Sequence, residues 1–194
     1  MNEIIVAITG ASGAAYAVRL LNFLAERGVR THVVITEAGA VVLEKELDVR
    51  LDLRAPDLSR LIERPTNVTY HHHSDIGTGI ASGACAAEAM VIVPCSMNTL
   101  GAVASGLAGN LVERAAAVMM KEGRPLILVP RETPLSAIHL RNMARLAEAA
   151  VCVLPAMPGF YHRPKGLDDM IDFIVGKILN RLRIENDLVT YDAE

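Results

Sequence analysis

Five short apolar runs alternate along this chain with longer segments whose apolar residues recur at helical spacing. The runs cover residues 4–8, 32–36, 89–93, 126–129 and 150–154. Helical spacing occurs in segments 14–27, 37–47, 110–122, 134–149 and 167–182. Continuous apolar runs are typical of strands buried on both faces, and their alternation with helices predicts an α/β fold with a doubly wound, mostly parallel sheet.

The length of the chain fits one folded unit with one core. A domain of 194 residues buries roughly 70% of the surface that its unfolded chain exposes. We expect this single domain over residues 1–183 and a polar C-terminal tail over 184–194. Residues 50–80 show no clear period, so no strand or helix is predicted there.

Composition predicts self-association. Because 52% of the residues are apolar and only 21% are charged, little polar material is left to cover a small monomer. We therefore expect a homo-oligomer with sizeable apolar interfaces.

Charge and cysteine content exclude several classes of protein. The net charge of −3 and the lack of a basic stripe interleaved with aromatic residues argue against a nucleic-acid partner. Three scattered cysteines are too few for a disulfide framework, which indicates a reducing compartment. The first apolar run follows Glu3 and is too short for a signal peptide or a membrane span. The expected location is the cytoplasm.

The turn Thr9-Gly10-Ala11-Ser12-Gly13 joins the first predicted strand to the first predicted helix. Glycines let backbone amides approach a ligand, and a helix N-terminus attracts negative charge, so the turn predicts a site for a phosphate-bearing ligand. Its G-x-x-G spacing is not the G-x-G-x-x-G of dinucleotide-binding proteins, which weakens a nicotinamide interpretation. Glu37, close to where a ribose-binding acid would follow the second strand, keeps that interpretation open.

Three predicted strands end in proline, at Pro94, Pro130 and Pro155. Proline stops the hydrogen-bond ladder, and residues able to bind a ligand follow each of the three. The loops concerned cover residues 95–99, 131–133 and 157–163. Ligands of open parallel sheets bind beyond the carboxyl ends of the strands, so these loops and the glycine turn should line one crevice.

Several residues of these loops are candidates for ligand binding or chemistry. Ser12 is a candidate to donate its hydroxyl to a phosphate or to a reacting group. Ser96 and Thr99 begin a helix after Pro94, where they suit both helix capping and phosphate binding. Cys95 is placed to be a nucleophile activated by a helix N-terminus, but no base for it is identifiable, so packing is the favoured role.

Four basic residues lie in or beside otherwise apolar elements, namely Arg114, Lys121, Arg131 and Lys177. Arg131 directly follows a strand-ending proline and precedes Glu132, so both belong to the expected crevice. A cluster of such cations would suit a phosphate leaving group. Glu46 and Glu132 are candidate proton carriers if the pocket raises their pKa towards neutrality.

The run His71-His72-His73 raises the possibility of a metal site. Consecutive side chains of an extended segment alternate between faces and cannot all ligate one ion, so no metal is predicted. His32, His139 and His162 are expected to make ordinary hydrogen bonds.

Together these motifs closely resemble those of the UbiX-type flavin prenyltransferases, once described as aromatic-acid decarboxylase subunits. The shared motifs cover nearly the whole chain and are Thr9-Gly10-Ala11-Ser12-Gly13-Ala14, Pro94-Cys95-Ser96, Asn110-Leu111, Glu113-Arg114-Ala115, Arg131-Glu132-Thr133-Pro134 and Pro158-Gly159-Phe160-Tyr161-His162. The resemblance implies a Rossmann-like or flavodoxin-like subunit of a dodecamer that joins the dimethylallyl group of dimethylallyl monophosphate to reduced FMN. The implied product is prenylated FMN, made for a UbiD-type decarboxylase.

The resemblance also implies roles for individual residues. It places FMN at Gly10, Ala11, Ser12, Thr36, Ser96, Met97, Asn98, Thr99 and Arg131. It places the prenyl phosphate at Arg114, Lys121, Arg131, Tyr161 and Lys177. It assigns proton transfer to Ser12, Glu46 and Glu132, with Glu132 the best candidate to help the phosphate leave and to remove a ring proton.

The chain departs from the family pattern at Lys177, where arginine is usual, and at Thr36, where serine is usual. Lysine is a point charge that cannot form a planar bidentate pair with phosphate. The nearest alternative is an FMN-dependent cysteine decarboxylase of related fold. Such enzymes look to depend on a histidine at about residues 79–82, and this chain has none there. A non-catalytic flavin carrier is the second alternative.

Overall fold

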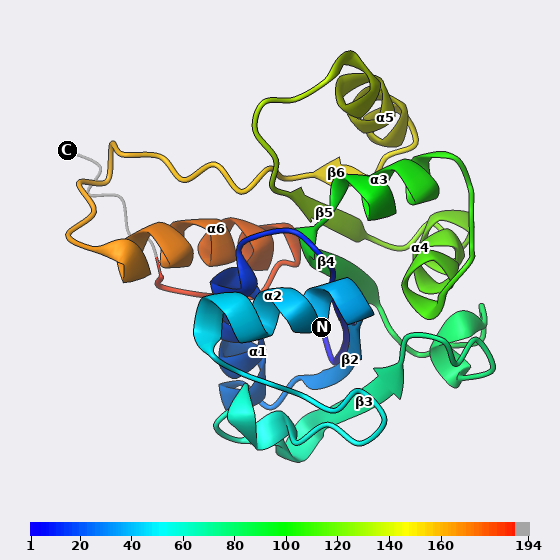
Figure 1. Ribbon diagram of the computed structural model, residues 1–194, viewed down its shortest axis with the longest axis horizontal. Helices are drawn as coiled ribbons and strands as arrows, with labels where there is room; N and C mark the ends of the chain where they lie inside the picture. The colour runs from blue at the N-terminus through cyan, green and yellow to red at the C-terminus, as the bar shows by residue number, and fades with distance from the viewer. Residues whose placement is uncertain (189–194) are drawn as a thin grey trace.

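The apolar runs form one six-stranded parallel sheet in the computed structural model, which describes residues 1–188 (Figure 1). The strands are β1 (Glu3–Ile8), β2 (Arg30–Ile35), β3 (Val68–His72), β4 (Ala89–Cys95), β5 (Leu126–Pro130) and β6 (Cys152–Val153). Their order in the sheet is β3-β2-β1-β4-β5-β6, and every neighbouring pair is parallel. The predicted doubly wound α/β fold in a single domain is confirmed.

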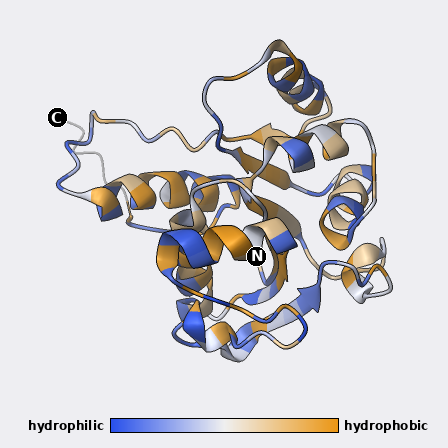
Figure 2. Cartoon of the chain, in the orientation of Figure 1, coloured by the Kyte–Doolittle hydropathy of each residue, from blue (hydrophilic) through white to orange (hydrophobic). Residues whose placement is uncertain are grey.

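Two helical layers cover the sheet because successive side chains of a strand point to opposite faces. The helices are α1 (Ala14–Glu26), α2 (Glu37–Leu47), α3 (Met97–Ala104), α4 (Leu111–Lys121), α5 (Ala137–Glu148) and α6 (Leu167–Arg181). Leu20 of α1 and Ile178 of α6 lie in one core, whereas Leu100 of α3 and Met119 of α4 lie in the other. Figure 2 shows the central strands hydrophobic and the outer sides of several helices hydrophilic. No helix within residues 1–188 is long and apolar enough to span a membrane.

The order of the strands reverses between β1 and β4, and Thr9 connects these two strands at their carboxyl ends. Its Oγ1 donates to the Pro94 carbonyl oxygen at 2.8 Å and accepts from the Ser96 amide at 2.8 Å. The Thr9 amide also donates to the Pro94 carbonyl, at 3.2 Å. In open parallel sheets, ligands bind at this reversal point.

Three sequence predictions about the strands are wrong in detail. Residues 50–80 contain β3 and two short 3₁₀ turns, Leu58–Arg60 and Pro65–Asn67, with a third at Gly79–Ala81. Pro94 does not end its strand, because Cys95 continues the ladder by pairing with Pro130 after a register shift. β6 has only two residues, and Pro155 lies beyond it.

The segment between β6 and α6 runs outward from the sheet to the start of α6 (Figure 1). Several of its large apolar side chains are exposed, including Met157, Phe160 and Tyr161. After α6, Ile184 and Leu188 pack against the core that contains residues of α1 and α6. The division at residue 183 stays a prediction, and residues 189–194 of the predicted tail lie outside the described part of the chain.

Thr9→Val tests the connection between β1 and β4. Valine keeps the shape of threonine but leaves the Ser96 amide without its acceptor, at a site where Thr9 is 1% exposed. A buried donor left unpaired costs about 1–3 kcal/mol, so we expect the free energy of unfolding in urea to fall by that amount. Thr69→Val, at an exposed position of β3, is the control and should change it little. Equal losses in both variants would contradict the proposed importance of this connection.

Candidate functional site

The loops after β1 and β5 meet at the carboxyl edge of the sheet. Arg131, directly after β5, donates from its Nε to the Ser12 carbonyl oxygen at 3.3 Å. Ser12 lies in the turn that enters α1, where Gly13 has a φ of 116°. That left-handed conformation favours glycine, and the Tyr16 ring lies within 2.9 Å of the place where a Cβ on Gly13 would sit. The predicted convergence of these two loops is therefore present in the structure.

The carboxylate of Glu46 binds the N-terminus of α1. Its Oε2 accepts from the Gly13 amide at 2.9 Å and from the Ala14 amide at 2.8 Å. Glu46 comes from the last turn of α2, so one helix caps another. The glycine turn was predicted as a phosphate site, but this carboxylate already pairs with the amides that would attract an anion.

Glu46 is held as a carboxylate. Burial favours its neutral form, but hydrogen bonds from the Ser12 side chain and from the Gly13 and Ala14 amides, together with the charge of Arg131, outweigh burial and lower the pKa of Glu46. The condition on which the residues alone made Glu46 a candidate proton carrier, a pKa raised towards neutrality, is therefore not met, because the N-terminus of α1 stabilises the carboxylate. Glu46 therefore stays ionised near neutral pH, where it is suited to orient Ser12 and is not suited to carry a proton.

Tyr16 is a further member of this group that the sequence prediction missed. It is half-buried, and its ring lies beside Gly13. Burial raises the pKa of Tyr16, the positive charge of Arg131 opposes that shift, and the negative charge of Glu46 adds to it. The spacing of three residues between Gly13 and Tyr16 is the signal that was available, since it places both on one side of the first turn of α1.

Two more helices begin at the same edge, each with a predicted FMN-binding residue as its cap. Thr36 Oγ1 accepts from the Gly39 amide at 3.0 Å at the start of α2. Ser96 Oγ accepts from the Thr99 amide at 3.2 Å at the start of α3. The predicted residues Met97 and Asn98 form the first turn of α3. Both caps are neutral hydroxyls, unlike the cap of α1. Glu37 places a carboxylate in the first turn of α2, whereas the first turn of α3 has no acidic residue and keeps the positive potential that suits a phosphate.

A cavity of about 420 Å³ lies beside Arg131 and Glu132. Thr133, Leu135 and Met157 are among its other lining residues. Glu132 is exposed, and its Oε1 accepts from the Thr133 amide at 3.0 Å. A cation and a carboxylate at adjacent positions thus line the same cavity.

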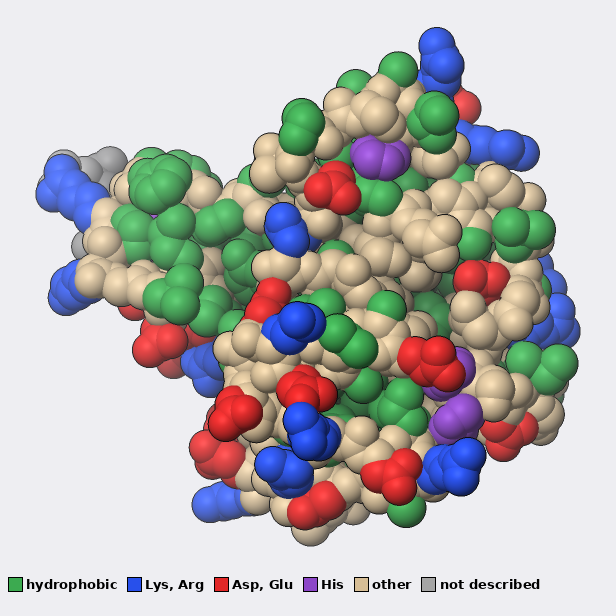
Figure 3. Space-filling view, in the orientation of Figure 1, with side chains coloured by type: hydrophobic (Ala, Val, Ile, Leu, Met, Phe, Trp, Pro, Cys, Tyr) green, Lys and Arg blue, Asp and Glu red, His purple; other side chains and the backbone are tan. Residues whose placement is uncertain are grey.

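Tyr161 and Lys177 are gathered by an aromatic cluster around Phe173. The Tyr161 ring meets Phe173 edge-on at 5.8 Å, and the Lys177 ammonium lies 5.3 Å from the centre of the Phe173 ring. His162 stacks on Phe173 at 5.0 Å. Figure 3 shows hydrophobic side chains gathered on the lobe formed by this part of the molecule.

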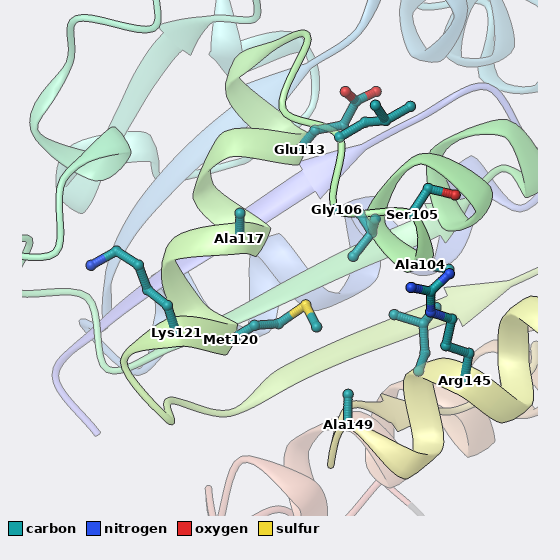
Figure 4. Close-up of a pocket in the computed structure, with 12 residues that line it drawn as sticks. Ala104, Ser105, Gly106, Glu113, Ala117, Met120, Lys121, Arg145 and Ala149 are labelled. Carbon is teal, nitrogen blue, oxygen red and sulfur yellow. The ribbon is translucent and has the colours of Figure 1, made fainter.

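Arg114 and Lys121 lie elsewhere, on α4, which covers the opposite side of the sheet from α6. Arg114 donates from its Nε to the Ala81 carbonyl oxygen at 3.1 Å. Lys121 lines a separate cavity of about 460 Å³ between α3, α4 and α5, together with Glu113 and Arg145 (Figure 4). Within one chain, these two predicted phosphate ligands are therefore not brought together with Arg131.

Cys95 and the histidines of residues 71–73 lie where packing explains their positions. Cys95 is fully buried, and burial raises the pKa of its thiol, which favours the packing role. His71 Nε2 lies 2.8 Å from His32 Nδ1 on the neighbouring strand, whereas His72 and His73 stack on each other. Across residues 1–188, no group of three or more His, Cys, Asp or Glu side chains is arranged to hold a metal ion. His162 departs from expectation, since neither ring nitrogen has a hydrogen-bond partner among the described residues.

Comparison with known proteins identifies the family. The flavoprotein family model matches residues 1–179. The flavin prenyltransferase UbiX of Halalkalibacterium halodurans is 50% identical over 186 residues, which cover 95% of this chain and 90% of that protein. The chain belongs to the UbiX flavin prenyltransferase family.

Solved structures of UbiX-like proteins share this fold over nearly the whole chain. A dodecameric FMN-dependent UbiX-like decarboxylase from Escherichia coli O157:H7 is 38% identical with a TM-score of 0.87, and the match covers 97% of this chain and 98% of that one. AnUbiX (PadA1), solved in complex with FMN and dimethylallyl pyrophosphate, is 35% identical with a TM-score of 0.86, and the match covers 98% and 99% of the two chains. The UbiX resemblance seen in the motifs is thereby confirmed.

Glu46→Gln tests the capping of α1. A group whose pKa is lowered in the folded state stabilises that state above its ordinary pKa of 4.5, and this contribution is lost as the pH falls through the lowered value. We expect Glu46→Gln to be less stable than the wild type at pH 7 and the difference to shrink below pH 4.5, as measured by urea unfolding. Glu148→Gln, which removes an exposed carboxylate at the end of α5, controls for the loss of one charge. A difference of the same size at pH 7 and pH 3 would exclude capping by a charged group.

Proposed function

We propose that this chain is a flavin prenyltransferase that joins the dimethylallyl group of dimethylallyl monophosphate to reduced FMN. The product is prenylated FMN, which serves a UbiD-type decarboxylase. The observation that carries the proposal is the hydrogen bond from the Arg131 side chain to the Ser12 carbonyl oxygen, beside the point where the strand order reverses, in a chain of the UbiX family. Reduced FMN supplies the electron-rich ring that accepts the allyl group.

The residues at the carboxyl edge fit a flavin mononucleotide. Thr36 and Ser96 are neutral caps at the N-termini of α2 and α3, and the N-terminus of α3, which has no acidic residue in its first turn, offers positive potential for the phosphate. The turn around Ser12 has its charge balanced by Glu46 and suits the uncharged ring. The residues proposed to hold FMN are Gly10, Ala11, Ser12, Thr36, Ser96, Met97, Asn98, Thr99 and Arg131.

We assign the phosphate of the allylic donor to basic and phenolic side chains from more than one copy of the chain. Arg131, Tyr161 and Lys177 come from one copy, while Arg114 and Lys121 come from a neighbour. Support comes from the separate position of α4 and from the exposure of Tyr161 and Phe160, which are 65% and 74% exposed. A homododecamer, the state of the Escherichia coli relative, would bring the two sets together.

In the proposed reaction, charge develops at both ends of the breaking bond, and the site must stabilise it. Cleavage of the allylic C–O bond leaves positive charge on carbon and negative charge on the departing phosphate. Fixed cations around the phosphate stabilise the latter without a metal ion. Glu132, beside Arg131 in the cavity, assists the phosphate and takes a proton from the flavin ring, while Glu46 orients Ser12 for proton transfer.

We also propose a cytoplasmic location. Cys85, Cys95 and Cys152 are all free thiols, as is usual in a reducing compartment.

Anaerobic incubation with reduced FMN and dimethylallyl monophosphate tests the function directly. We expect the mass of the flavin to increase by that of the dimethylallyl unit, and a parallel reaction with the diphosphate measures which donor Lys177 favours. FMN binding without a mass change would favour a flavin carrier. Release of CO₂ from a cysteinyl peptide would favour the decarboxylase alternative.

Glu132→Gln is expected to bind FMN normally and to slow prenyl transfer about a hundredfold or more, which is the usual size of a general acid–base contribution. The measurements are flavin titration and the rate of product formation. Lys121→Ala should also be slow, through weaker binding of the donor phosphate. Unchanged turnover in Glu132→Gln would exclude its role in proton transfer.

Assemblies that mix Glu132→Gln chains with Lys121→Ala chains provide the control for sharing between copies. Some sites in the mixture combine a wild-type Glu132 from one copy with a wild-type Lys121 from another. Activity should therefore rise above that of either variant alone. No rise on mixing would place both residues in the site of a single chain.

A further inference from the structure

His162 has two buried ring nitrogens, Nδ1 and Nε2, and neither has a hydrogen-bond partner among the described residues. A neutral imidazole carries one N–H donor and one nitrogen acceptor. Buried polar atoms of folded proteins are nearly always paired, so two unpaired nitrogens on one ring point to a partner that binds from outside the chain.

Packing, and not polar contact, fixes the position of this ring. His162 lies nearly parallel to Phe173, with an angle of 19° between the rings, and Tyr161 approaches it edge-on at 6.1 Å. The backbone turns sharply here, because the Arg163 amide donates to the Phe160 carbonyl oxygen at 3.0 Å. Arg163 has a φ of 53°, so the turn is held in a conformation that arginine rarely adopts.

The groups around His162 indicate what kind of partner it takes. The Lys177 ammonium lies over the same Phe173 ring, and the Tyr161 phenol belongs to the same cluster. An ammonium, a phenol and an imidazole N–H are all donors, and a phosphate monoester offers acceptor oxygens to all three.

The turn that carries His162 lies at an exposed part of the molecule. The Phe160 and Tyr161 side chains are mostly exposed, and the Tyr161 ring meets His162 and Phe173 edge-on. In this inference a shift of Tyr161 towards a ligand opens the path to the imidazole, and the stack of His162 on Phe173 stays in place.

We propose that His162 is a further binding residue for the phosphate of the allylic donor, and that the N–H donor of its imidazole is paired only when this phosphate is bound. The inference rests on the proposed function for the identity of the donor. His162 adds a hydrogen-bond donor to Tyr161 and Lys177, the side chains proposed to bind this phosphate. Its N–H partly replaces the second N–H that an arginine at position 177 would offer.

His162→Phe separates ligand binding from packing. Phenylalanine keeps the stack on Phe173 and removes both unpaired nitrogens, and replacing an unpaired buried polar group with an apolar one of similar shape does not destabilise a protein. We expect a melting temperature equal to or above that of the wild type. We also expect the KM for dimethylallyl monophosphate to rise about ten- to a hundredfold with kcat nearly unchanged, which is the effect of losing one charge-assisted hydrogen bond in the bound state.

Two further measurements make the test independent of turnover. The rise in melting temperature that dimethylallyl monophosphate produces in the wild type should be smaller in His162→Phe, while affinity for FMN should not change. His162→Gln, which restores an N–H donor, should recover part of the donor affinity.

Three results would overturn the inference. A lower melting temperature with unchanged KM would make His162 a packing residue. A change in assembly size in size-exclusion chromatography would identify a neighbouring chain as its partner. Equal stabilisation of wild type and His162→Phe by the donor would exclude contact with the phosphate. A wild type that binds the donor but transfers no allyl group would count against the proposed function alone, since the thermal shift still reports on His162.

Discussion

The parallel direction of all six strands is the constraint on which the rest of this structure depends. It brings every strand's carboxyl end, and the N-terminus of the helix that follows, to one edge of the sheet. Thr9 connects β1 to β4 at the point where the strand order reverses, through hydrogen bonds to Pro94 and Ser96. Residues more than a hundred positions apart, such as Ser12 and Arg131, are neighbours for this reason.

The charges at this edge are balanced unevenly. Glu46 pairs with the N-terminus of α1 and is close enough to Arg131 for the two charges to interact. The N-termini of α2 and α3 are capped by Thr36 and Ser96, which are uncharged. Because Glu37 lies in the first turn of α2 and no acidic residue lies in that of α3, the positive region of the edge is at α3, although all three helices present the same backbone groups.

The fold was predictable because strands that are buried on both faces consist of apolar residues, which the sequence shows directly. Buried strands such as β4 are apolar throughout, and α2 begins and ends as predicted, after the capping residue Thr36. β3 was missed because it pairs with a single neighbour and contains Thr69, His71 and His72, so it lacks an apolar run. Figure 2 shows this strand largely hydrophilic.

The site was predictable where it follows from topology and unpredictable where it depends on packing between helices. The proximity of Arg131 to Ser12 follows from the rule that parallel strands end together. The contact of Glu46 with Gly13 requires knowing how the end of α2 lies over the start of α1. The unpaired state of His162 depends on the stack with Phe173 from α6, which no local pattern records.

The cap that Glu46 provides has a consequence for the direction in which a nucleotide enters. A phosphate arriving at the α1 turn would meet the Glu46 carboxylate, whereas one arriving at α3 would meet a helix N-terminus with a neutral cap and no acidic residue in its first turn. An uncharged aromatic ring has the opposite preference. It has no ionic hydration shell to lose when it binds at the turn around Ser12, so it does not incur the cost that a phosphate would. One acidic side chain thus gives the crevice a polarity, so that a molecule with a charged end and a flat end binds in a single orientation.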